Sequence, residues 1–224
     1  VFTAAVESAA CWPWSEFCMN VQFTYNEAVF RVAHSANKRP VSKAEIRTLT
    51  RQRRAAGEHE LIDATLISHL LDWLGSATRV AAYSPMPGEP GGADLVASLA
   101  AKYEVWLPIT PKKGELRWGL FDGELHQGAH FGIWEPKGPG EADLSSLELD
   151  AVLVPALGID RSGVRLGQGA GYYDRALAKV TCPIIAVVYD DELHEELPSE
   201  PHDHPVNGVV TQSGFQWLGN HKGQ

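Results

Sequence analysis

Apolar residues recur along the chain first with the period of a helix and then in short continuous runs. Between residues 58 and 74 they fall three and four positions apart, which predicts an amphipathic helix. This stripe comprises Leu61, Ile62, Leu66, Ile67, Leu70, Leu71 and Leu74. The pattern then predicts a strand over 79–84, a helix over 93–103 and a strand over 104–108. Such a β-α-β unit is typical of a parallel sheet.

Further elements continue the alternation toward the C-terminus. Three apolar runs predict strands over 151–157, 183–190 and 207–212, and YYDRALAKV predicts a helix over 172–180. Together these elements predict an α/β fold, a single three-layer α/β/α domain with a mostly parallel central sheet. In such sheets ligands bind beyond the carboxyl ends of the strands.

Two other segments have distinct local patterns. Residues 115–128 are expected to form a β-hairpin with Asp122 and Gly123 at its turn. The motif SKAE fits a capping box, in which Ser42 caps a helix and Glu45 lies three residues later. Residues 1–36 have neither a helical nor a strand period and are predicted to be an N-terminal extension of unknown role. Residues 37–224 then form the α/β domain.

Composition limits the classes of protein that fit. A chain of 224 residues suits one domain, and its net charge of −9 argues against nucleic-acid binding. No apolar run approaches the length of a membrane span. The three cysteines form no C-x-x-C motif and no even disulfide set, which favours a reducing, cytoplasmic environment. We expect a monomer or a small homo-oligomer.

The segment RLGQGAGYYDR, Arg165–Arg175, carries the strongest signal for chemistry. It lies between a predicted strand and a predicted helix, and its alternate glycines would let backbone N–H groups approach an anion closely. A tight turn that needs glycine for its dihedral angles is the alternative. The flanking Arg165, two tyrosines and Asp174 favour a phosphate site with an accompanying metal ion. The spacing matches neither a G-x-G-x-x-G fingerprint nor a Walker A loop.

The first predicted helix is unusually basic for an acidic protein. Seven basic residues and one acid lie between Lys38 and Arg54. Lys43 and Arg47 are four residues apart, so they share one helical face. A solvated basic face and a phosphate-binding face both remain open on this evidence.

The glycine segment resembles the signature R-L-G-x-G-x-G-Y-Y-D of the 5-formyltetrahydrofolate cyclo-ligase (5,10-methenyltetrahydrofolate synthetase) family at all eight fixed positions. Lys43 and Arg47 match the K-x-x-x-R helix of that family, and the resemblance spans about residues 40–215. It implies that these two segments bind ATP. The implied ATP-binding residues are Lys43, Ala44, Glu45, Ile46, Arg47, Arg165, Leu166, Gly167, Gln168, Gly169, Ala170, Gly171, Tyr172 and Tyr173.

The resemblance also implies the reaction, in which 5-formyltetrahydrofolate and ATP give 5,10-methenyltetrahydrofolate, ADP and phosphate with Mg²⁺. Arg165 and Lys43 are the implied catalytic residues. Asp174 and Asp203 are the implied metal ligands, because Mg²⁺ prefers carboxylates together with phosphate oxygens. The segment PHDHP around Asp203 contains two histidines but does not predict a zinc site, because the prolines at its two ends favour an extended loop.

The implied partner of ATP is a reduced folate, which can carry a polyglutamate tail. The implied substrate-binding residues are Ser84, Glu89, Phe131, Gln168 and Tyr172. A carboxylate such as Glu89 suits the paired N–H donors of an aminopyrimidine, although acids in Pro/Gly turns are usually solvated. Phe131 could instead be a core residue.

The three remaining arginines of the basic helix have a less specific prediction. Arg51, Arg53 and Arg54 are expected to face solvent or to attract the acidic tail of the folate. Two alternatives to the implied activity remain open. One is a non-catalytic nucleotide- or folate-binding module of the same fold, and the other is a different ATP-dependent ligase or sugar-phosphate enzyme.

Overall fold

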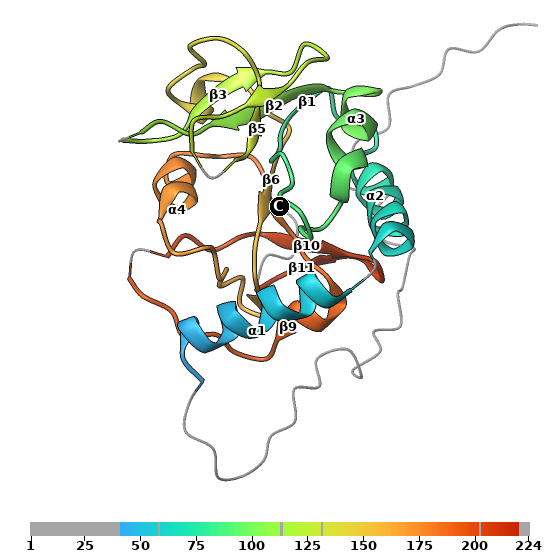
Figure 1. The fold of residues 1–224 in the computed structure, drawn as a ribbon, viewed down its shortest axis with the longest axis vertical. Coiled ribbons are helices and arrows are strands. Elements are labelled where there is room, and N and C mark those ends of the chain that lie inside the picture. Colours follow the sequence, from blue (N-terminus) through green and yellow to red (C-terminus); the bar gives the residue numbers. More distant parts are fainter. Residues whose placement is uncertain (1–40, 58, 113, 131, 202, 220–224) are drawn as a thin grey trace, which may run out of the picture.

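A seven-stranded sheet runs through the centre of the computed structural model (Figure 1), which describes residues 41–57, 59–112, 114–130, 132–201 and 203–219. The strand order is β11-β10-β8-β6-β1-β2-β3. The five inner strands pair in parallel, and the two edge strands are antiparallel to their neighbours. The strands are β1 (Arg79–Ala81), β2 (Glu104–Ile109), β3 (Arg117–Leu120), β6 (Ala151–Pro155), β8 (Ile184–Val187), β10 (Gly208–Thr211) and β11 (Gly214–Trp217). The predicted α/β architecture is therefore confirmed.

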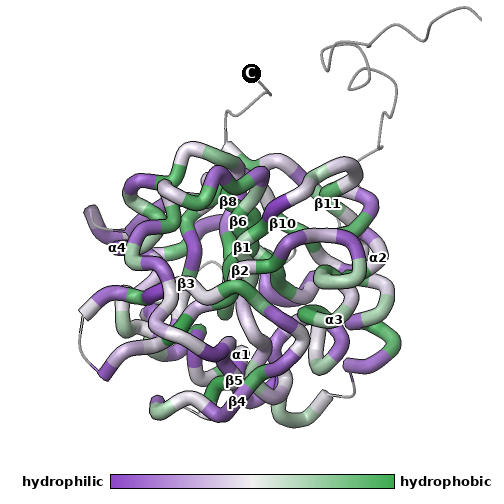
Figure 2. The backbone as a smooth tube through the Cα atoms, turned by 90° about the horizontal axis from the view of Figure 1, so that it is seen from above, coloured by the Kyte–Doolittle hydropathy of each residue, from purple (hydrophilic) through white to green (hydrophobic). Residues whose placement is uncertain are grey.

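Helices cover both faces of this sheet. Helices α2 (Glu60–Leu74) and α3 (Leu95–Ala100) lie on one face, and α4 (Tyr172–Leu177) lies on the other (Figure 2). Successive strand residues serve opposite faces, because side chains alternate along a strand. In β6, Leu153 packs with the α2 and α3 side, whereas Val152 packs with the α4 side. The sheet thus separates two hydrophobic cores, which accounts for the continuous apolar runs of the inner strands.

Helix α1 (Lys43–Ala56) lies apart from these layers and begins at the predicted capping box. The Ser42 side chain accepts a hydrogen bond from the Glu45 backbone N–H, and the Glu45 carboxylate accepts from the Ser42 backbone N–H at 2.9 Å. One face of α1 is buried at Ile46, Thr50 and Arg54, four residues apart in each step. That face fixes the helix against the loops at one end of the sheet.

Short elements complete the chain. The described segments also contain two two-stranded sheets and three 3₁₀ helices. These elements are β4 (His126–Gln127), β5 (Trp134–Glu135), β7 (Ile159–Asp160), β9 (Leu193–His194), η2 (Gly92–Asp94), η3 (Leu144–Ser146) and η4 (Asp190–Glu192). No helix among the described residues is both long enough and apolar enough to cross a membrane.

Several sequence predictions need correction. The hairpin over 115–128 does not form, because β3 pairs with β2 and with Glu141, while β4 pairs with β5. Gly123 does have the positive φ expected of a turn, +102°. Leu61, assigned to the buried stripe of α2, is 87% exposed in the first turn of that helix. The predicted extension over 1–36 lies outside the described residues.

Candidate active site

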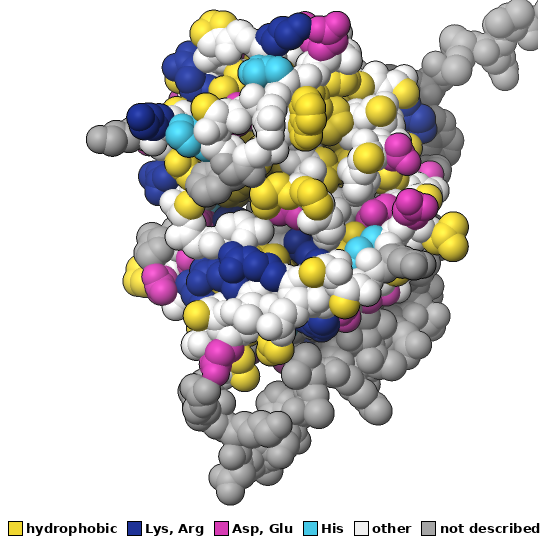
Figure 3. All heavy atoms as spheres, in the orientation of Figure 1, with side chains coloured by type: hydrophobic (Ala, Val, Ile, Leu, Met, Phe, Trp, Pro, Cys, Tyr) yellow, Lys and Arg dark blue, Asp and Glu magenta, His cyan; other side chains and the backbone are white. Residues whose placement is uncertain are grey.

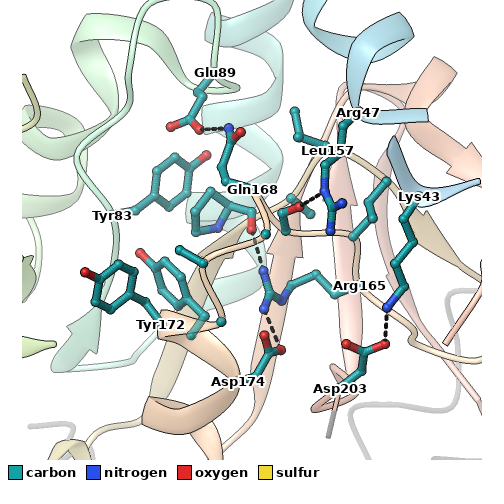
Figure 4. Close-up of a pocket in the computed structure, with 18 of the residues that line it drawn as sticks. Lys43, Arg47, Tyr83, Glu89, Leu157, Arg165, Gln168, Tyr172, Asp174 and Asp203 are labelled. Carbon is teal, nitrogen blue, oxygen red and sulfur yellow. Dashed lines mark hydrogen bonds and ion pairs between the residues drawn. The ribbon is translucent and has the colours of Figure 1, made fainter. Parts of the chain in front are cut away.

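One cavity of about 1020 Å³ brings the predicted segments together (Figure 4). Its walls come from α1, the segments after β1, β2 and β6, the glycine loop, residues 198–200 and Asp203. This is the carboxyl edge of the parallel strands, as predicted. The fold therefore places the basic helix and the glycine loop around one volume large enough for two small-molecule ligands.

Helix α1 presents a second face, toward this cavity. Lys43, Arg47 and Arg51 lie four residues apart and all line it. Figure 3 shows Lys and Arg side chains gathered in a band along this helix. Thr50, on the buried face, donates to the backbone oxygen of Leu157 at 3.0 Å and so ties the helix to the segment after β6. Three cationic side chains are thereby held at one wall.

The first two cations have specific partners. Lys43 Nζ lies 2.7 Å from Asp203 Oδ2 and 3.5 Å from Glu200 Oε1. Arg47 Nε donates to the backbone oxygen of Gly167 at 2.9 Å. The K-x-x-x-R pattern therefore contacts both the glycine loop and the segment that carries Asp203.

The three glycines of the loop serve different purposes. Gly169 and Gly171 have φ angles of +105° and +66°, which favour residues without a side chain. Gly167 has no such angle, but a Cβ there would lie only 2.8 Å from Arg165 Nη1. Its small size makes room for the guanidinium. The loop leads into α4 as predicted, although that helix has only six residues.

Arg165 is buried at the centre of the site. Its Nη2 donates to Asp174 Oδ1 at 2.8 Å and its Nη1 to the Pro155 oxygen at 3.3 Å. The guanidinium also lies over the Tyr173 ring, 5.6 Å from the centroid. Its Nε is buried and has no hydrogen-bond partner among the described residues. A buried donor on a cavity wall without a partner suits an anionic ligand.

Both predicted metal ligands line the cavity. Asp174 pairs with Arg165, and it also accepts a hydrogen bond from the His204 backbone N–H at 3.4 Å. Asp203 pairs with Lys43 and accepts from the Glu200 backbone N–H at 2.8 Å. In the described part of the chain, no group of three or more His, Cys, Asp or Glu side chains is placed to hold a metal ion. Any ion between these carboxylates would draw its remaining ligands from bound substrate or water.

Glu89 is not the solvated acid of an ordinary turn. It is only 6% exposed, and its Oε2 accepts from the Met86 backbone N–H at 3.0 Å. Burial raises the pKa of its carboxyl, while hydrogen bonding to Met86 and the charge of Arg54 oppose that rise. Ser84, the other predicted substrate residue near β1, is also buried and lines the same cavity. The cavity thus has a carboxyl group in its wall opposite the cations.

Gln168 links the two sides. Its Oε1 accepts from Arg51 Nη2 at 2.6 Å, and its Nε2 lies 3.4 Å from Glu89 Oε1. Tyr172 lines the cavity beside the loop. Tyr173 also reaches it and packs edge-on against Trp118, and burial raises the pKa of its phenol.

Several predicted residues are placed differently. Ile46 packs in a hydrophobic cluster with Leu157 and Leu166, and Glu45 caps α1. Phe131 lies outside the described residues. The prediction that Arg54 faces solvent is wrong, because its guanidinium is buried against Glu192. No local signal pointed to that pair, whose members are 138 positions apart.

Other cavity residues were missed by sequence reasoning. Tyr83 is buried, and its hydroxyl donates to the Pro90 oxygen at 2.6 Å, which fixes the loop that carries Glu89. Thr110, after β2, lines the cavity and its backbone N–H donates to Glu135. The available signal was their place near strand ends, because Tyr83 lies in the last two residues of the strand predicted over 79–84 and Thr110 lies two residues after the strand predicted over 104–108.

Comparisons with known proteins agree with this arrangement. A model of the 5-formyltetrahydrofolate cyclo-ligase family matches residues 36–212. The chain is 39% identical over 186 residues to a 5-formyltetrahydrofolate cyclo-ligase of Mycolicibacterium smegmatis, covering 77% of this chain and 94% of that protein. The enzyme of the same name from Haemophilus influenzae is 31% identical over 188 residues, covering 79% and 98%. The solved 5,10-methenyltetrahydrofolate synthetase of Aquifex aeolicus superposes with a TM-score of 0.68 at 28% identity, over 81% of this chain and 95% of that one.

Proposed function

The chain belongs to the 5-formyltetrahydrofolate cyclo-ligase family, and from that premise we propose that it converts 5-formyltetrahydrofolate to 5,10-methenyltetrahydrofolate at the expense of ATP. The observation that carries the proposal is the shared cavity. One side of it is lined by Lys43, Arg47, Arg165 and the glycine loop, and Glu89 lies in its wall on the other (Figure 4). Such a cavity has donors for a triphosphate and an acceptor for a pterin.

The reaction explains why cations are needed and a nucleophilic side chain is not. Oxygen bound to a formyl carbon is a poor leaving group. In the proposed first step, the terminal phosphoryl group of ATP passes to the formyl oxygen, and ADP is released. N10 then attacks the formyl carbon, the C–O bond breaks, phosphate departs and N10 loses its proton. Phosphoryl transfer is catalysed chiefly by positioning and by neutralising charge.

The residues divide between these tasks. Lys43 and Arg47 are proposed to hold ATP phosphates, and Arg165 to stabilise charge on the phosphoryl group in transfer. The loop backbone that is proposed to bind the phosphates comprises Leu166, Gly167, Gln168, Gly169, Ala170 and Gly171. Tyr172 and Tyr173 lie beside it. Ser84, Glu89, Gln168 and Tyr172 are proposed to contact the folate.

The donor set also fits magnesium. Asp174 and Asp203 offer carboxylate oxygens on the cavity wall, and phosphate and water oxygens are the usual complement of Mg²⁺. When bound, the ion would neutralise phosphate charge. Both carboxylates are paired with cations in this structure, so each has a counter-charge before ligands enter.

A direct assay tests the proposal. Purified protein is incubated with 5-formyltetrahydrofolate, ATP and Mg²⁺ while the absorbance of the methenyl product is followed. We expect product to form with release of one ADP and one phosphate, and none to form without ATP. Absence of product would leave the chain as a binding module of the same fold, and ATP consumption that depends on another acceptor would indicate a different ligase.

A further inference from the structure

Arg54 lies in a buried ionic cluster behind the cavity. Its Nε and Nη2 contact the two carboxylate oxygens of Glu192 at 2.6 and 2.7 Å. The same Nη2 donates to the Ala156 backbone oxygen at 2.6 Å, and the guanidinium lies 5.8 Å from the centroid of the Tyr189 ring. Both charged side chains are almost fully buried. An unpaired charge here would be costly, so each side chain depends on the other.

This cluster reaches the loop that carries Glu89. Gly88, the residue before Glu89, has a φ of +80°, and a Cβ there would lie 3.4 Å from the Cβ of Arg54. The loop backbone therefore passes directly against α1. Arg54 also holds Ala156, which lines the cavity. Arg54 thus joins three parts of the site: it lies on the helix of the ATP-side cations, its guanidinium binds the exit of β6, and its Cβ and backbone pack against the loop that carries Glu89.

The charges around Glu89 come from several elements. Arg54 on α1 opposes the rise in the Glu89 pKa, whereas the Glu192 carboxylate after β8 adds to it. The neutral neighbours are Gln168, which is itself bonded to Arg51, and the phenols of Tyr83 and Tyr173. Asp63 of α2 bonds the Gly91 backbone N–H at the far end of the loop. Arg54 and Glu192 are therefore the charged pair whose members act on Glu89 in opposite directions.

We propose that Arg54 is a positioning residue for the folate, which fixes the Glu89 loop against α1 and keeps a positive charge beside the Glu89 carboxylate. The proposal rests on the proposed function, in which ionised Glu89 accepts the N–H donors of the pterin. Glu192 anchors the guanidinium but contributes the opposing charge. A purely structural ion pair would make the loss of either partner equivalent. The proposed role makes the two losses opposite in sign.

The test compares the pH dependence of kcat/KM for 5-formyltetrahydrofolate in the variants Arg54→Gln and Glu192→Gln. Protonation of Glu89 should lower kcat/KM on the acidic side. Arg54→Gln removes a positive charge, so this acidic limb should move to higher pH by about half a unit or more. Glu192→Gln removes a negative charge and should move the limb to lower pH. Arg54→Lys keeps the charge and should leave the limb close to that of wild type.

Controls separate this inference from folding and from the proposed function. Arg53→Gln removes a cation from the same helix at an exposed position and should not move the limb. The pH profile of kcat/KM for ATP should not show the opposite shifts that are expected for the folate in Arg54→Gln and Glu192→Gln. If Arg54→Gln does not fold, Arg54→Met with Glu192→Leu removes both charges and keeps the volume apolar. Its limb should lie above that of Glu192→Gln, because that single variant keeps the positive charge of Arg54 and the double variant does not.

Shifts in the same direction for Arg54→Gln and Glu192→Gln, or no shift in either, overturn the positioning role. For the double variant, a limb at or below that of Glu192→Gln does the same. Wild-type turnover is measured first. Absence of methenyl product from wild type contradicts the proposed function, whereas normal turnover with unmoved limbs contradicts only the role of Arg54.

Discussion

Arg165 Nη2 lies 2.8 Å from Asp174 Oδ1, so the first residue of the glycine segment is joined to the first turn of the helix that follows it. The pair closes the loop on itself and orients both groups at the cavity wall. Its guanidinium still has a buried Nε without a described partner. These contacts suit the role proposed for Arg165, which is to stabilise charge on the phosphoryl group in transfer.

Asp174→Asn should reduce cyclisation severely in a protein that still folds, with a lower melting temperature because buried Arg165 loses its ion pair. The amide keeps the size of the side chain but removes the charge proposed to hold Mg²⁺ and to orient Arg165. Loss of one preorganised electrostatic group typically lowers kcat by about 100-fold or more. Steady-state methenyl formation measures the loss, and a circular dichroism melt checks folding. Asp94→Asn, at an exposed carboxylate outside the cavity lining, is the matched control. Equal turnover in both variants would remove the proposed role of Asp174.

Lys43→Ala should raise the KM for ATP more than it lowers kcat. A charge-assisted hydrogen bond contributes about 1.5–3 kcal/mol, so the expected rise is about tenfold or more. Initial rates over a range of ATP concentrations at saturating folate measure it. Lys179→Ala, which removes an exposed lysine paired with Asp143, should leave KM unchanged. An unaltered KM in the Lys43 variant would return this face of α1 to an ordinary solvated surface.

Local signals in the sequence predicted much of the fold and the outline of the site. The capping box predicted the start of α1, because Ser42 and Glu45 need only each other. The continuous apolar runs predicted inner strands, since a strand buried on both faces has no polar side. Gly169 and Gly171 were recognisable because positive φ angles select glycine locally.

Contacts between distant residues were beyond such signals. A basic stretch does not distinguish Arg51, which lines the cavity, from Arg54, which pairs with a carboxylate 138 positions away. The failed hairpin has the same cause, because the pairing of β3 depends on the edge offered by β2. Gly167 likewise is favoured by the nearby Arg165 guanidinium, which leaves no room for a Cβ, rather than by its own dihedral angles.

Gly169→Ala should impair turnover beyond its cost to stability. The φ of +105° strains any residue with a Cβ, typically by about 1–3 kcal/mol. The new methyl group would lie 3.5 Å from Arg47 Cζ. Gly123→Ala is a matched control, because its φ is +102° and a Cβ there would have nothing within 4 Å. Both variants should lose similar stability in thermal melts. Only in Gly169→Ala should kcat/KM for ATP fall, by about tenfold. Equal kcat/KM values in Gly169→Ala and Gly123→Ala would contradict a ligand-binding role for the loop.

Glu89→Gln should make the protein more stable and a poorer folate binder. Above its folded pKa the wild type buries a carboxylate with few compensating contacts, whereas the amide can still accept from the Met86 N–H. We expect the melting temperature to rise by about 2–4 °C, the shift that corresponds to about 1 kcal/mol in a chain of this size. The KM for 5-formyltetrahydrofolate should rise about tenfold, because the amide offers one acceptor in place of two.

The pH dependence of that stability difference follows from the raised pKa of Glu89. Between the unfolded and folded pKa values the folded wild type holds a proton that the unfolded chain has released, so its stability falls as pH rises through this window. Below the window Glu89 is protonated in both states and the penalty vanishes. The advantage of Glu89→Gln should therefore be full above the folded pKa and disappear toward acid pH. Melting temperatures of both proteins across that range test this, and an advantage that grows toward acid pH would contradict a buried, destabilising carboxylate.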